Sequence, residues 1–161
     1  MPKNVPKKNL IPLIERISGD FGFTPKRIGT FLGHTLRHLE GQKRVHQEFS
    51  QQKIYDLFRF IHDNRLDQAI AKPIMNILMD YPKMDFPSIL TSLKFKKRSQ
   101  DELLAPVSFL IGKFREIRKS DNPKVTLNWL MGQIRNQAIG NIPLNEYSRL
   151  IQVQIDKEIS E

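Results

Sequence analysis

The chain has 161 residues, of which 39% are hydrophobic, enough for one domain or two small domains with a buried core. It contains no cysteine, which excludes disulfides, a thiolate nucleophile and cysteine metal sites, and no apolar run approaches the roughly 18 residues that cross a membrane. Its net charge of +9 is spread over both halves and indicates a polyanionic partner such as nucleic acid.

Residues 1–8 contain little to bury and predict a mobile basic arm. Apolar side chains then recur at helical spacing in the first half of the chain. The segments with this pattern are 9–21, 25–39, 51–62, 68–80 and a shorter one through Leu93. N-cap signals precede several of them, at Thr24, Ser50 and Asp67, and Pro73 predicts a kink or a late start in the fourth. Gly29 and Gly33 are expected to let another helix approach closely.

The second half begins after the densest basic run, Lys94-Phe95-Lys96-Lys97-Arg98. Ser99 and Glu102 form a capping-box pattern that predicts a helix reaching Arg118 or Lys119, with Pro106 near enough to its start to be tolerated. Its expected apolar stripe follows at heptad-like spacing: Leu103, Val107, Leu110, Phe114 and Ile117. Asn122-Pro123 starts the next helix, and Gly140-Asn141 ends it. A final helix is predicted over 143–159.

The Asn122 helix carries Trp129, the single tryptophan of the chain. Trp129 shares an apolar stripe with Leu130 and Ile134, so we expect it to be largely buried. Glycine inside a helix costs roughly 1 kcal/mol relative to alanine. We therefore expect Gly132 to face a neighbouring helix at close range.

No segment shows the two-residue alternation of a strand, so the sequence predicts an all-α fold of two small helical bundles in tandem. The predicted organisation is a flexible arm at 1–8, a helical subdomain at 9–81, a basic linker with a short helix at 82–98, and a three-helix subdomain at 99–161. With neither cysteine nor a membrane segment, we expect a cytoplasmic protein.

No catalytic pattern emerges: the chain lacks a phosphate-binding glycine loop and a nucleophile elbow, and its carboxylates sit at helix starts and on polar faces. His34 and His38 share a helix face, but no third strong ligand accompanies them or His46, so solvated histidines are expected and no metal. No cofactor or small-molecule substrate is indicated. Phe95 is predicted either to contact a base or to anchor the linker.

The segment Asn122-Pro123-Lys124, followed by Asn128-Trp129-Leu130-Met131-Gly132, resembles the last subdomain of the GatB/YqeY family. This family forms the C-terminal tail of the GatB and GatE subunits of the tRNA-dependent amidotransferases. Leu13-Ile14-Glu15-Arg16 and Gly22-Phe23-Thr24-Pro25 are similar to the start of the GatE tail. The chain departs from the family at Ala71 and Pro73, where the family usually has glycine and an acidic residue.

The resemblance implies a YqeY-like second subdomain and a non-catalytic module that contacts tRNA, because the family's catalytic parts lie elsewhere. The enzymes of that family amidate Glu-tRNA(Gln) or Asp-tRNA(Asn), and other amidotransferase subunits are possible partners. The alternative is a helical protein–protein interaction domain whose charge is incidental. A small hydrolase or transferase is disfavoured because no catalytic constellation is present.

Two groups of cations are candidate RNA contacts through the phosphate backbone. The first is the basic run between the halves, and the second lies around the Asn122-Pro123 turn, which is expected to bring its members together. Their residues are Lys94, Lys96, Lys97 and Arg98 in the first group, and Arg115, Arg118, Lys119 and Lys124 in the second.

Overall fold

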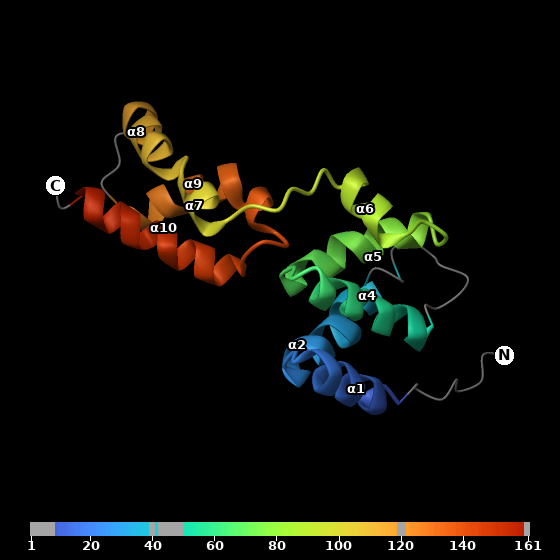
Figure 1. Cartoon of the computed structure of the whole chain (residues 1–161). Helices are drawn as coiled ribbons and strands as arrows, with labels where there is room; N and C mark the ends of the chain where they lie inside the picture. Colours follow the sequence, from blue (N-terminus) through green and yellow to red (C-terminus); the bar gives the residue numbers. More distant parts are fainter. Residues whose placement is uncertain (1–8, 39–40, 42–49, 119–121, 160–161) are drawn as a thin grey trace. The chain divides into compact units, whose positions relative to one another are not determined.

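The computed structural model describes residues 9–38, 41, 50–118 and 122–159. All regular structure in these residues is helical and none of it is strand, which confirms the all-α prediction (Figure 1). No helix within these ranges is both long enough and apolar enough to cross a membrane. Contacts divide the chain into a first unit, Met1–Arg65 with Ala71–Ile89, and a second unit, Leu66–Ile70 with Leu90–Glu161. Part of the expected first subdomain, 66–70, thus groups with the second unit.

The first unit is built from short helices, with α1 packed against α2 and α4, and α5 packed against η1 and α4. Its described elements are α1 (Ile11–Phe21), α2 (Pro25–Thr30), the π-helix η1 (Phe31–Leu36), α4 (Gln51–Asp63), α5 (Ala71–Asp80) and the first part of α6 (Phe86–Ser92).

Helix starts in this unit follow the local signals only in part. The Oγ of Ser50 accepts a hydrogen bond from the backbone N–H of Lys53 at 3.1 Å, as an N-cap should. Thr24 makes no such side-chain bond, so α2 owes its start to Pro25 at the first helical position. After Asp67 a 3₁₀ turn intervenes and α5 begins only at Ala71, which leaves Pro73 in the first turn and confirms the late start.

The first-unit core is apolar and aromatic. Phe58 is fully buried and meets the rings of Phe23 and Phe31 edge-on, with centroid distances of 5.4 and 5.5 Å. At its edge the Tyr55 hydroxyl donates a 2.7 Å hydrogen bond to Asp20 Oδ2, which raises the pKa of Tyr55. The apolar side chains that recur at helical spacing along α4 are all buried: Ile54, Leu57, Phe58 and Ile61.

The glycines of α2 and η1 do not mark a close helix contact. A Cβ added to Gly33 would meet nothing within 4 Å, and one on Gly29 would meet only the Cδ1 of Ile14 at an ordinary 3.9 Å. The expectation of a close approach at Gly33 is therefore wrong. Gly33 instead lies within the π-helical stretch Phe31–Leu36, on its exposed side.

The second unit packs α8, α9 and α10 against one another, with α9 and α10 side by side (Figure 1). Its described elements are the 3₁₀ turn η2 (Gln68–Ile70), the end of α6, α7 (Gln100–Leu104), α8 (Val107–Arg118), α9 (Pro123–Ala138) and α10 (Leu144–Ile159). Asn122 caps α9 as predicted, because its Oδ1 accepts the Lys124 N–H at 3.0 Å.

The single helix expected over 99–119 is divided in two. Ser99 caps α7 as predicted, accepting the Glu102 N–H at 3.2 Å, but α7 ends at Leu104. Pro106 has no N–H to donate to the carbonyl four residues earlier, so a turn at Ala105–Pro106 separates α7 from α8. Pro106 was therefore wrongly expected to be tolerated.

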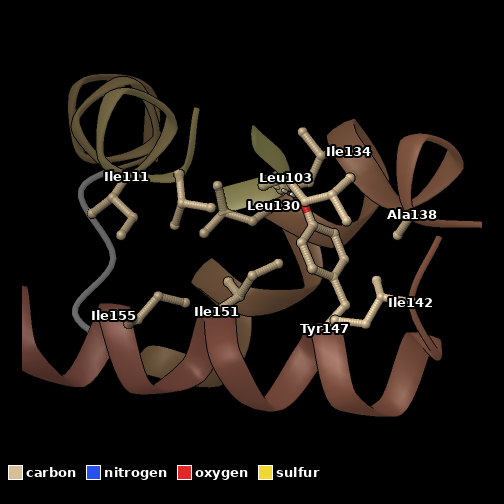
Figure 2. Close-up of a cluster of buried hydrophobic side chains, with 10 residues drawn as sticks. Leu103, Ile111, Leu130, Ile134, Ala138, Ile142, Tyr147, Ile151 and Ile155 are labelled. Carbon is tan, nitrogen blue, oxygen red and sulfur yellow. Dashed lines mark hydrogen bonds between the residues drawn. The ribbon is translucent and has the colours of Figure 1, made fainter. Parts of the chain in front are cut away.

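The second-unit core surrounds Tyr147 of α10 (Figure 2). Its ring is fully buried, and its hydroxyl donates a 2.6 Å hydrogen bond to the carbonyl oxygen of Leu103 in α7. The other buried members come from α7, α8, α9, α10 and the turn after α9: Leu103, Val107, Ile111, Leu130, Ile134, Ala138, Ile142, Ile151 and Ile155. Burial raises the pKa of Tyr147 to about 12.

Trp129, expected to be largely buried, is partly exposed and packs at the margin of this core, with its ring 5.5 Å from that of Phe114. Two other expectations for this core need correction. Gly132 is exposed, and a Cβ added there would meet nothing within 4 Å, so no helix presses against it. Ile117, predicted to continue the buried stripe of α8, is 65% exposed.

Candidate nucleic-acid interface

The basic run begins where α6 ends. The N–H groups of Lys94 and Phe95 donate to the carbonyls of Thr91 and Leu90, each at 3.0 Å, and Lys94 adopts a left-handed φ of 56°. Lysine rarely takes this conformation, because its Cβ crowds the backbone there. The chain then leaves the helix as an irregular loop, which we call the basic loop, residues 94–98.

Phe95 anchors the basic loop to the turn that follows α9. That turn has Gly140 at φ 89°, and a Cβ on Gly140 would lie 2.8 Å from Phe95 Cε2 and 3.1 Å from Ile70 Cδ1. Contacts under 3.0 Å do not occur for real Cβ atoms, so glycine leaves the space in which the Phe95 ring sits. Of the two predictions for Phe95, the packing favours the anchor over the base contact.

A second fastening comes from Asn141, the next residue of the turn. Its Nδ2 donates to the carbonyl oxygen of Lys96 at 3.0 Å, and its Oδ1 accepts the backbone N–H of Arg98 at 2.9 Å. The same Nδ2 also donates to the carbonyl oxygen of Gln137 at 3.1 Å. One amide side chain thus ties the loop backbone to the end of α9.

Segment 66–70 joins the same turn from a third direction. The backbone N–H of Asp67 donates to the carbonyl oxygen of Gly140 at 2.7 Å, and the Asp67 carboxylate caps η2 by accepting the Ala69 N–H at 3.1 Å. These contacts explain why 66–70 groups with the second unit. The turn at Gly140 and Asn141 therefore gathers segments that are distant in sequence.

The first cation group keeps its side chains largely in solvent while its backbone is fastened. Lys94, Lys96 and Lys97 are exposed, and Arg98 is half-buried. Flexible cations on a fixed frame suit phosphate oxygens, whose contacts position a protein on nucleic acid without reading its sequence. The chemistry available to the basic loop is therefore backbone contact with a polyanion.

The second cation group is described only in part. Arg115 on α8 and Lys124 in the first turn of α9 are exposed, and Arg118 is the last residue of α8. Lys119 lies outside the described residues. The expected grouping of these cations at the Asn122-Pro123 turn stays a prediction.

His34 and His38 are both exposed, and His46 lies outside the described residues. Within the part of the chain that the structure describes, no three His, Asp or Glu side chains gather to hold a metal ion.

Asn141 is a site residue that the amino-acid sequence did not point to. The Gly140-Asn141 pair gave a helix-stop signal, which accounts for both residues locally. The hydrogen bond between Asn141 and Arg98 joins residues more than forty positions apart, and a single sequence shows no pattern for such a contact. An asparagine at the end of a helix opposite a basic loop could have been suspected only once the topology was known.

No family model, curated protein or solved structure matches this chain. The assignment to the GatB/YqeY family therefore stays a prediction that depends on the sequence motifs.

Proposed function

We propose that this chain is a non-catalytic tRNA-binding module, homologous to the C-terminal tail of a Glu-tRNA(Gln) or Asp-tRNA(Asn) amidotransferase subunit. In this proposal the chain forms two tandem helical bundles, the second of YqeY type, and works with tRNA and other amidotransferase subunits. The observation that carries it is the basic loop, whose lysines are exposed while its backbone is fastened to α9. The net charge of +9 supports the same class of partner.

Recognition in this proposal is by tRNA shape and phosphate. Each phosphate contact releases a condensed counterion, so affinity falls as salt rises, with a logarithmic slope of roughly one per contact. A loop with Lys94, Lys96 and Lys97 offers up to three such contacts. Because phosphate contacts carry no sequence information, the lysines should contribute about equally to binding of different tRNAs.

The test is a charge-reversed triple variant, Lys94→Glu, Lys96→Glu and Lys97→Glu, titrated against a tRNA panel at two salt concentrations. We expect weaker binding to all tRNAs and a salt slope lower by about two to three. The matched control reverses three lysines that are exposed in the first unit, Lys26, Lys72 and Lys83. Both variants lower the net charge from +9 to +3, since each exchange removes two charges.

The comparison separates a site from a general charge effect. If both variants lose affinity equally, net charge alone attracts tRNA and the basic loop is not the site. If the wild-type chain binds no tRNA at either salt concentration, the proposed function is wrong.

A second candidate, a protein-interaction domain, is favoured by one face of α8. Phe109 is 67% exposed and Ile117, two turns later, is 65% exposed. Lys113 lies between them, with its Nζ 5.6 Å from the centre of the Phe109 ring. Large apolar side chains exposed on one helix are typical of docking surfaces. Apolar docking would persist as salt rises, whereas phosphate contact would not.

A further inference from the structure

We infer that Asn141 is a positioning residue for polyanion binding, which holds the basic loop in one conformation before the partner arrives. The inference rests on the proposed function and adds a neutral residue to a site otherwise defined by charge. Asn141 accepts from the Arg98 N–H and donates to the Lys96 carbonyl, so its two bonds bracket Lys97 on both sides.

Holding the loop in place affects the affinity, because ordering a loop without regular structure on binding costs free energy. Each residue fixed on binding loses backbone conformational entropy, which reduces the affinity that its contacts provide. Residues 96–98 belong to no helix, so the hydrogen-bond ladder of a helix does not hold them. Because Asn141 holds the loop backbone in the folded chain, the loss of conformational entropy occurs on folding. The loop then binds phosphate without a further entropy cost for its backbone.

Gly140 and Phe95 provide the second half of this arrangement. The Phe95 ring occupies the space beside Gly140 that a Cβ would fill, next to Ile70. The ring and the Asn141 amide therefore hold the two ends of the stretch that carries Lys96 and Lys97. Neither group bears a charge, and the Nδ2 of Asn141 already donates to the carbonyl oxygens of Lys96 and Gln137.

Because Asn141 is neutral, its loss should affect the affinity for tRNA without changing the salt dependence. Removing a lysine removes a phosphate contact and lowers the salt slope, but removing Asn141 leaves every cation in place. Asn141→Ala should therefore weaken tRNA binding about three- to tenfold, the usual range for one lost hydrogen-bonding group, at an unchanged salt slope. A merely structural role would leave the affinity unchanged once folding is verified.

The experiment uses the full chain with three variants: Asn141→Ala, Phe95→Ala and the control Asn136→Ala, which removes an exposed asparagine of α9. Titration with tRNA at two salt concentrations gives affinity and slope, and amide hydrogen exchange of Arg98 by NMR reports the fastening itself. We expect faster Arg98 exchange and weaker binding in Asn141→Ala, weaker binding in Phe95→Ala, and wild-type behaviour in Asn136→Ala.

The outcomes distinguish the two proposals. If the wild-type chain binds tRNA and the lysine triple variant does not, but Asn141→Ala binds like wild type, the positioning role is refuted and the proposed function stands. If Arg98 exchanges equally fast in Asn141→Ala and wild type, the fastening does not exist in solution. If the wild-type chain does not bind tRNA, both proposals fall together.

Discussion

The hydroxyl of Tyr147 offers the sharpest test of how the second unit is held together. Tyr147→Phe removes one oxygen and keeps the ring, so the core loses its 2.6 Å hydrogen bond to Leu103 without a large cavity. Both residues are almost fully buried, with relative exposures of 0% and 1%. Water therefore cannot replace the lost donor, and leaving a buried acceptor without this partner costs about 1–3 kcal/mol of unfolding free energy.

The same hydroxyl predicts a pH dependence. Burial raises the pKa of Tyr147 to about 12 from the usual 10.0. Below pH 10 the tyrosine is protonated in both states and contributes no pH dependence. Between about pH 10 and 12 the unfolded chain loses the proton and the folded chain keeps it, so stability falls as pH rises, by about 1.4 kcal/mol per unit at most.

The assay is urea-induced unfolding followed by the fluorescence of Trp129, which is the only tryptophan and reports on the second unit. At neutral pH the variant should be less stable than wild type, and between pH 10 and 12 the difference should shrink. The control Tyr81→Phe alters a side chain that is 60% exposed, and should change stability by less than about 0.5 kcal/mol. A difference between wild type and Tyr147→Phe that stays constant through this alkaline range would refute the buried hydroxyl.

Two matched pairs test the packing further. Gly132→Ala should stabilise the chain by up to about 1 kcal/mol in urea unfolding, because the added Cβ enters open space on a helix. Gly140→Ala should destabilise it by about 1–3 kcal/mol, because residue 140 has a φ of 89° and the added Cβ would clash with Phe95. Phe114→Ala should lower the unfolding free energy by about 3–5 kcal/mol, because the Phe114 ring is fully buried. Trp129→Ala should lower it by less, because the Trp129 ring is only partly buried. Equal losses of stability in thermal unfolding would contradict this ranking.

Helix starts were predictable because their causes are local. Ser50, Ser99 and Asn122 each accept a backbone N–H two or three residues later, a contact that needs no distant part of the chain. The buried stripes were predictable for a related reason, since helical spacing determines which side chains share a face. Residues Ile151 and Ile155 of α10 illustrate this, one turn apart and both fully buried.

The errors arose where a local pattern competes with a tertiary or a steric effect. Helical spacing placed Ile117 on the buried stripe, but the core of the second unit does not extend to the end of α8. The glycine at 132 suggested a close helix, yet the space around it is open. Pro106 was judged near enough to the start of its helix, but its missing N–H ended α7 instead.

The candidate site divides in the same way. The density of positive charge at 94–98 is visible in the sequence, and so is its position between the two halves. The fixed conformation of that segment is not visible, because it depends on Asn141 and Gly140, more than forty residues away. Charge is a property of composition, whereas preorganisation is a property of the folded chain.

The two candidate functions use different elements of the second unit, so they can be tested independently. The proposed tRNA contact depends on the basic loop, and protein docking would depend on Phe109 and Ile117 of α8. Charge reversal in the loop leaves the α8 face intact, and polar substitution on α8 leaves the loop lysines intact. A module that belongs to a larger amidotransferase would need both kinds of surface, one for phosphate and one for protein. The loop variant should then lose tRNA binding and keep protein binding, and the α8 variant should lose protein binding and keep tRNA binding. This pair of results would assign one surface to each partner.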